Sequence, residues 1–341
     1  MMPVNTGNER LRWIKTSLFS SWINTVLSLI SLILFFLIVI PMVEFVFYNA
    51  NWRVIADNFH LFLVGSYPKE QLWRIFLSIA LLAVMIVFSG IFQKLRSKFF
   101  VPAWLLYFLL SLILLSGFSG SVILPKVESH LWGGLLLTLL VTVVGILFSF
   151  PLGVLLALGR RSDLLVIQMF CIGFIEMIRG VPMITLLFMG QVLIPLFLPP
   201  TWVISNLVRM MIAVTFFSAA YMAEYVRGGL QSLSAGQIEA AQALGLNRFQ
   251  TTFFVVLPQA VRAVIPGLTG QCIALFKDTS LVAIVGLLDL TGAAKAAIGQ
   301  ADFIGLEAEV FMAIALVYWV FSFSMSKYSR YLEKQFGVGI R

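Results

Sequence analysis

Long apolar segments dominate this sequence and restrict what it can fold into. Runs of 18 or more apolar residues recur along the whole 341-residue chain, and each is long enough to cross a bilayer as a helix. Charged residues make up 11% of the chain, against about a quarter in an average soluble domain. The sequence therefore predicts an all-α membrane protein.

We expect about eight spanning segments. The fifth is long for one helix and contains Pro182, which is expected to kink a membrane helix rather than end it. Counting this segment once also keeps the Arg160–Arg161 connection on the same side of the membrane as the connection at 231–258. The expected segments are 23–48, 72–92, 101–118, 132–158, 164–198, 207–230, 260–288 and 308–328.

The basic residues orient these segments. With eight spans both termini lie in the cytoplasm, and fifteen of the 23 lysines and arginines then fall on the cytoplasmic side, against six outside. This asymmetry follows the positive-inside rule. The net charge of +8 is spread over the connections, so it does not indicate nucleic-acid binding. The first segment exceeds the roughly 7–15 apolar residues of a signal peptide, so we expect it to remain as an anchor.

The chain is expected to have two parts. Residues 1–131 form an N-terminal extension with three spans, and residues 132–337 form a core with five spans that carries every informative motif.

The connection at 231–258 holds the most informative motif. Residues 239–258 read EAAQALGLNRFQTTFFVVLP. A short amphipathic helix is expected from Glu239, Ala240 and Ala241, with Ser234 available as a cap. Gly245 permits a turn at positive φ just past the helix end, and the small alanines permit close approach of a partner surface. The alternative is an ordinary amphipathic connection.

This segment resembles the EAA loop of permease subunits in ABC importers, with Val255 in place of the family's Ile. The strings IRGVP (178–182) and KDTSL (277–281) resemble the polar amino-acid permease family, and this resemblance covers about 132–337. The three extra spans and LWGGLLLTLL (131–140) resemble the longer permeases of general L-amino-acid uptake systems.

The resemblance implies a type I importer permease that moves polar L-amino acids by alternating access across a bacterial cytoplasmic (inner) membrane. It implies that Glu239, Ala240, Ala241 and Gly245 couple this chain to an ATPase. The implied partners are two ABC ATPase subunits, a second permease and an external amino-acid-binding protein. The second permease is either a copy of this chain or a sister chain, and the long N-terminal region favours a sister chain. ATP and Mg²⁺ would be held by the ATPase. We call residues 231–258 the coupling loop.

Polar residues inside the seventh segment are candidates for substrate binding. Charges at bilayer depth cost about 2.5–3.5 kcal/mol on insertion scales and normally face a cavity or a partner. Lys277, Asp278, Thr279 and Ser280 offer both charges and two hydroxyls to an amino acid, whereas the alternative is a structural ion pair. Gln271 lies seven residues before Asp278, on the same helix face, and its neutral amide favours neutral or mixed polar substrates.

Nearby residues are expected to loosen that helix. Pro266, Gly267 and Gly270 precede Gln271, and a broken helix near mid-membrane exposes backbone groups that can bind a substrate.

Two further Glu–Arg sets have the i, i+3 spacing that places both side chains on one helix face. These sets are Glu176 with Arg179 and Glu224 with Arg227. Each pairs internally or with a neighbouring helix, so we expect gate or structural roles.

The sequence lacks the residue patterns that nucleotide binding and metal binding require. The chain contains no G-x-x-x-x-G-K-[ST] and no Cys/His/carboxylate set with metal-ligand spacing, so we expect neither enzyme activity, nor a bound cofactor, nor a metal. The alternative functions are a self-sufficient secondary amino-acid transporter or channel and a non-transporting scaffold. A secondary transporter would be expected to show inverted repeats, and the sequence contains no convincing one.

Overall fold

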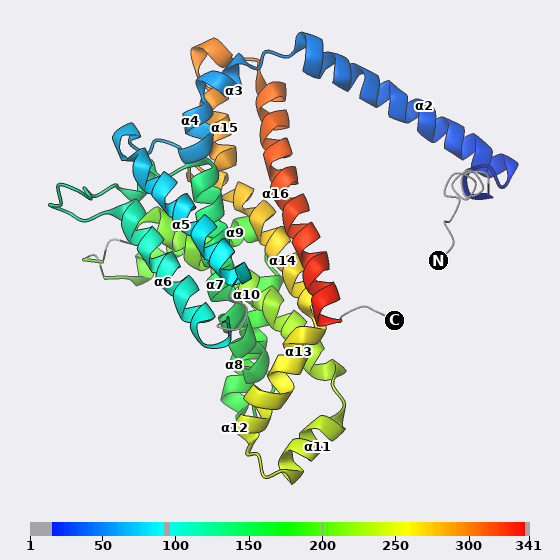
Figure 1. The fold of residues 1–341 in the computed structure, drawn as a ribbon, viewed down its shortest axis with the longest axis vertical. Coiled ribbons are helices and arrows are strands. Elements are labelled where there is room, and N and C mark those ends of the chain that lie inside the picture. The colour runs from blue at the N-terminus through cyan, green and yellow to red at the C-terminus, as the bar shows by residue number, and fades with distance from the viewer. Residues whose placement is uncertain (1–15, 92–95, 200, 203, 338–341) are drawn as a thin grey trace. The chain divides into compact units, whose positions relative to one another are not determined.

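The computed structural model describes residues 16–91, 96–199, 201–202 and 204–337, and this part of the chain is built from helices (Figure 1). The chain divides into two compact units, Met1–Arg53 and Val54–Arg341. Each is described by itself. The basic residues of 1–15, 92–95 and 338–341 lie outside the described residues, so the orientation based on them stays a prediction.

The described residues of the first unit consist mainly of one long apolar helix. Helix α2 (Trp22–Glu44) begins at Ser21, whose side chain accepts a hydrogen bond from the Asn24 amide. It continues through the π-helical turn η1 (Phe45–Asn49). The 28 residues of Trp22–Asn49 are long and apolar enough to cross a membrane, so the first expected span is confirmed in place and length.

The second unit holds the other helices. Some of its elements are short helices of a single turn in loops, and others are the short helices of the coupling loop. In chain order the elements are α3 (Arg53–Asp57), α4 (Phe59–Val64), η2 (Lys69–Gln71), α5 (Leu72–Ile91), α6 (Arg96–Ser116), η3 (Ser129–Leu131), α7 (Gly134–Gly159), α8 (Leu165–Arg179), α9 (Met183–Phe197), α10 (Asn206–Ser232), α11 (Ala235–Ala243), α12 (Arg248–Gln250), η4 (Thr251–Val256), α13 (Leu257–Ala263), α14 (Ile265–Asp278), η5 (Thr279–Val285), α15 (Leu290–Ile298), η6 (Ala301–Phe303) and α16 (Glu307–Phe336).

The expected all-α membrane class is confirmed. Six helices of the described residues are long and apolar enough to cross a membrane, or up to seven when α8 and α9 are counted as one span. The remaining expected span, 101–118, corresponds to α6, whose apolar part Pro102–Ser116 is shorter. The number eight is therefore approximate, although every expected segment contains a helix.

The fifth segment differs from the expected kinked helix. α8 and α9 are separate helices with 110° between them, and Gly180, Val181 and Pro182 lie outside both. Proline has no N–H to donate and keeps the residue before it out of the helical region. Pro182 instead precedes α9 as its N-cap residue, with ψ 143°. The prediction of a kink was wrong, because the helix ends here.

Helices α7 and α10 form the centre of the core. They pack closely because small residues face each other: a Cβ added to Gly153 would lie 2.8 Å from Cβ of Met222 and 3.0 Å from the Ala219 carbonyl oxygen. Val141, Val214 and Ala220 are fully buried in the same core. This packing fixes the ends of α7 and α10, which carry the charged residues described below.

Part of the predicted extension is joined to the core. α4 lies against α7 and α15, and a Cβ on Gly65 would be 2.4 Å from Cα of Gly133. The side-chain amide of Gln300 donates a hydrogen bond to Oδ1 of Asn58 at 2.7 Å. Fully buried Arg74 donates to the Pro125 carbonyl at 3.0 Å. Residues 54–131 thus form one unit with 132–337.

Candidate functional site: the coupling loop and the polar residues between helices

The coupling loop forms a short helix, a turn and a second helical stretch. α11 begins at Ala235, four residues before the expected start, and Ser234 occupies the N-cap position without a side-chain cap bond. Gly245 has φ +83° with open space around its Cβ position, which confirms the expected turn. Asn247 and Gln250 then form a capping box at α12.

Most of the predicted coupling residues are open to a partner. Glu239, Ala240 and Gly245 are exposed, but Ala241 is 4% exposed and packs inward, so of the two alanines Ala240 alone is open to a partner. Three large apolar side chains of this loop are also exposed: Leu244 at 81%, Phe249 at 63% and Phe254 at 70%. Exposed apolar groups clustered on one loop mark an interaction surface.

The coupling loop and the α7–α8 connection lie at the same end of the molecule. Arg248 of α12 forms a charge-assisted hydrogen bond with Asp163, and a cavity of about 640 Å³ lies between the two segments, lined by residues such as Ile167 and Gln242. Because α10 alone leads back to this end, α8 and α9 together lead away from it, which is consistent with counting them as one span.

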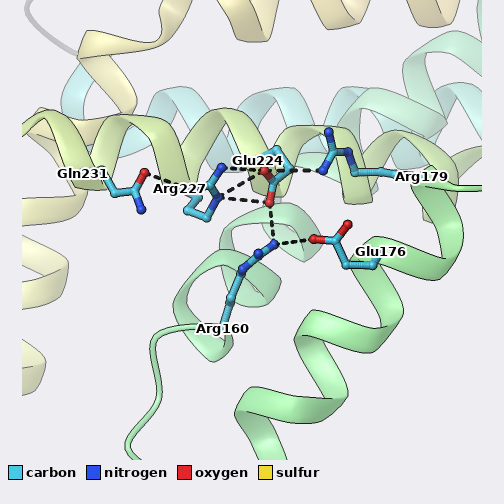
Figure 2. A network of polar contacts seen from close by, with 6 residues as sticks. All are labelled: Arg160, Glu176, Arg179, Glu224, Arg227 and Gln231. Carbon is cyan, nitrogen blue, oxygen red and sulfur yellow. Dashed lines mark hydrogen bonds and ion pairs between the residues drawn. The ribbon is translucent and has the colours of Figure 1, made fainter.

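Charged residues at this end converge on one carboxylate (Figure 2). Glu224 accepts hydrogen bonds from Arg160 Nη1 at 2.8 Å and from Arg227 Nη2 at 2.7 Å, and its Oε2 lies 3.5 Å from Arg179 Nη1. Arg160 Nη1 also donates to Glu176 at 3.1 Å. We call these five residues, together with Gln231, which accepts from Arg227 at 2.8 Å, the Glu224 network.

The sequence left open whether each Glu–Arg set pairs internally. Glu224 and Arg227 do pair within α10, whereas Glu176 and Arg179 contact other elements. The sequence analysis missed Arg160, which follows the last residue of α7. Its signal was a basic residue at a helix C-terminus, but such residues normally serve only the helix dipole.

The seventh segment places its polar residues on different faces. Gln271 is 6% exposed and Thr279 is fully buried, with its hydroxyl donating to the Phe276 carbonyl at 2.7 Å. Asp278 is half-buried, whereas Lys277 is exposed in the middle of the span Ile265–Val285. Thus the structure does not bring all five predicted binding residues to one point within this chain, because Lys277 faces outward.

The helix is interrupted before Gln271, but at Val264, between α13 and α14, and not at the glycines. α14 then runs through Pro266, Gly267 and Gly270, because Pro266 stands in the first turn, where no N–H is required. A second irregular part follows α14. η5 is a seven-residue 3₁₀-helix, longer than such helices usually are and typical of a hinge or strained sequence.

A buried aspartate lies just after this segment, at the N-cap position of α15. Asp289 is fully buried and accepts hydrogen bonds from the amides of Gly292 at 2.9 Å and Thr291 at 3.1 Å. The hydroxyl of Tyr318 lies 3.4 Å from it. Burial raises the pKa of Asp289 to about 6, because the charged form loses hydration.

Long apolar helices, with a charged network and a loop of exposed apolar side chains at one end, indicate a membrane-embedded protein. In agreement, residues 149–338 match the family model described as binding-protein-dependent transport system inner membrane component. The chain belongs to this family, and it is a multi-pass permease subunit of an ABC transporter.

Similar proteins extend this assignment over the whole length. The chain is 41% identical to the inner membrane amino-acid ABC transporter permease protein YhdY of Escherichia coli (strain K12), covering 99% of this chain and 96% of that protein. It is 34% identical to the glutamate/glutamine/aspartate/asparagine transport system permease protein BztC of Rhodobacter capsulatus, covering 95% and 93%.

Shorter relatives match only part of the chain. The glutamate/aspartate import permease protein GltK of Escherichia coli O157:H7 is 35% identical over 64% of this chain and 98% of its own length. A solved structure described as an amino acid ABC transporter with histidines is 28% identical, with a TM-score of 0.53 over 59% of this chain and 92% of that one.

Proposed function

We propose that this chain imports polar L-amino acids by alternating access, driven by ATP that is bound and hydrolysed with Mg²⁺ on a separate ATPase. The observation that carries the substrate class is the 41% identity over 99% of the chain to a permease named for amino acids. In this proposal both termini and the coupling loop face the cytoplasm of a bacterial inner membrane, in line with the positive-inside rule.

The coupling loop is the proposed contact with the ATPase. Glu239, Ala240 and Gly245 are exposed beside Leu244 and Phe254, so an ATPase surface could bury apolar side chains around the small residues. An importer with two ATPase subunits requires one coupling loop for each ATPase subunit. This chain carries one coupling loop, so a second permease is required, and a sister chain is the proposed partner.

The outward position of Lys277 supports the same conclusion. A charged ammonium exposed at mid-span is unfavourable against lipid, so this face of α14 is expected to meet a second permease or an aqueous path. Pro266 and Gly270 are exposed on the same face, and a Cβ at Gly270 would meet nothing within 4 Å. A small-residue face of this kind permits close helix packing.

We assign substrate contacts to Gln271, Lys277, Asp278, Thr279 and Ser280 in the assembled pair. Lys277 supplies a cation for the substrate carboxylate, and Asp278 supplies an anion for its ammonium group. The 3₁₀-helix that begins at Thr279 is the proposed site of local rearrangement. An external binding protein delivers the amino acid, and ATP drives the cycle only by binding one state more tightly than the other.

The test is ATPase activity in a reconstituted complex of this chain with a sister permease, the ATPase and an amino-acid-binding protein. Each of the twenty amino acids is added in turn, with Glu239→Lys as the coupling control. We expect stimulation by a few polar amino acids and its loss in the variant. An assembled, hydrolysing complex that no amino acid stimulates would contradict the proposed substrate class.

A further inference from the structure

One carboxylate connects three helices that lead to different working parts of the molecule. Glu224 lies on α10, which ends eight residues later in the coupling loop. Arg179 is the last residue of α8, directly before the 110° break. Arg160 follows the last residue of α7. Figure 2 shows the three side chains meeting from separate ribbons.

The electrostatics of the network depend on Glu224. Its side chain is 16% exposed, and the three guanidinium groups that surround it are 24%, 34% and 30% exposed for Arg160, Arg179 and Arg227. Charges in such a partly buried position are screened less than surface charges. Without this carboxylate three cations would remain together, with Glu176 as the one acid of the network.

Arg160 is the residue that fastens α8 to α10. Its Nη1 atom donates both to Glu176 on α8 at 3.1 Å and to Glu224 on α10 at 2.8 Å. Three residues further along, Asp163 is paired with Arg248 of the coupling loop. Residues 160–163 therefore contact the coupling loop at one end and the two helices at the other.

The break between α8 and α9 is the point in this arrangement that can move. Gly180 and Val181 lie outside both helices, and Pro182 cannot donate a backbone hydrogen bond. Short non-helical segments between rigid helices are where hinge motions are absorbed. The Glu224 network holds Arg179 on one side of this break, so it sets the position of α8 relative to α10.

We propose that Arg160 and Glu224 are positioning residues that transmit movement of the coupling loop to the break between α8 and α9. This inference rests on the proposed function, in which an ATPase moves that loop. In this proposal the two residues act through the helices that they hold, and not by binding substrate or nucleotide. They keep α7, α8 and α10 together as one rigid block. Displacement of the coupling loop therefore changes the angle between α8 and α9, whereas without these residues each helix would move separately.

The test compares Arg160→Gln with the matched control Arg161→Gln in the complete reconstituted complex. Arg161 is the adjacent exposed arginine, and the ion pairs that form the Glu224 network do not include it. Two quantities are measured: the amount of amino acid transported per ATP hydrolysed, and hydrogen exchange of the backbone amides at 177–187. We expect Arg160→Gln to lower transport per ATP at least tenfold and to raise exchange at 177–187, with both unchanged in the control.

Conservative variants make the result decisive. Arg160→Lys keeps the charge and is expected to restore part of the transport per ATP, and Glu224→Gln is expected to reproduce the Arg160→Gln defect. Unchanged exchange at 177–187 in Arg160→Gln, or a loss of transport that only follows a loss of ATPase activity, overturns the inference. If Arg160→Gln does not assemble, Arg160→Lys takes its place, and wild-type exchange and transport per ATP in that variant would equally overturn it.

The experiment distinguishes failure of the proposed function from failure of the proposed role of Arg160 and Glu224. A wild-type complex that no amino acid stimulates contradicts the substrate class and the coupling proposal. Hydrogen exchange at 177–187 is measured without a substrate, so it still reports whether Arg160 holds the end of α8.

Discussion

Gln300 and Asn58 form a 2.7 Å hydrogen bond between residues 242 positions apart. Asn58 is 7% exposed, and its own amide donates to the Val54 carbonyl at 3.1 Å. The bond joins the end of the α15 region to the α3–α4 corner, so the part of the extension from Val54 onward is held by specific polar contacts as well as by apolar packing.

Removing this bond is expected to destabilise the second unit. Asn58→Ala leaves the Gln300 amide without this acceptor, and a lost buried hydrogen bond costs about 1–3 kcal/mol. Thermal unfolding in detergent measures the effect. In a double-mutant cycle the combined Asn58→Ala and Gln300→Ala change should be smaller than the sum of the two. Strict additivity would show that the bond contributes nothing.

Two glycines with positive φ provide a matched steric comparison. A Cβ at Gly65 would lie 2.4 Å from Cα of Gly133, whereas Gly120, with φ +82°, has nothing within 4 Å. We expect Gly120→Ala to cost about 1–2 kcal/mol from its backbone conformation. Gly65→Ala must also separate two backbones, so its yield of folded protein should fall far below that of Gly120→Ala. Equal yields would contradict the close contact.

Asp289 gives stability a defined pH dependence. Its pKa is about 6 in the folded chain, against 3.8 for an unperturbed aspartate, so the folded state binds a proton more tightly than the unfolded state does. The resulting stabilisation is fully present below pH 3.8 and is lost as the pH rises to about 6; it amounts to about 3 kcal/mol. Unfolding midpoints measured from about pH 4.5 to about pH 7.5 should show this slope, and Asp289→Asn should remove it.

The apolar side chains of the coupling loop are expected to contribute to ATPase binding. Burying a side chain such as Leu244 contributes about 1.5–3 kcal/mol, so Leu244→Asp should weaken binding at least tenfold in a titration of the ATPase. Val122→Asp is the control, because Val122 is 95% exposed on a loop outside the coupling loop. If both variants bind the ATPase as the wild type does, the loop is not the contact.

Gln271 is expected to influence which amino acids are carried. Gln271→Glu introduces a carboxylate beside the proposed path, so the order of stimulation should shift toward cationic amino acids such as arginine and lysine. Gln335→Glu, on α16, adds the same charge at an exposed position outside the coupling loop and should leave the order unchanged. An unaltered order in Gln271→Glu would remove Gln271 from the substrate contacts.

Local patterns in the sequence predicted much of this structure. Apolar length located each spanning segment, and Gly245 marked a turn that requires positive φ. The break at Pro182 was not predictable in this way, because one proline is compatible with a kink or a complete end. The end of α8 also carries a contact of Arg179 with a residue 45 positions later, which no local pattern contains.

The polar sites were less predictable for the same physical reason. The i, i+3 spacing of Glu176 and Arg179 was visible, but their partners belong to other helices. Arg160 resembled an ordinary residue at a helix end. The assignment of substrate residues stays a prediction, since Lys277 faces out of this chain and its surroundings depend on a second subunit.

The contact of Gly65 with Gly133 limits how freely this protein can exchange parts during evolution. GltK is matched over 98% of its length by 64% of this chain, so a permease of this family can exist at the shorter length. At this one contact the added part meets the core through bare backbone, so no side chain at these two positions can be altered to repair a poor fit. A chimera that grafts this extension onto a shorter relative would therefore need glycine at both positions from the start.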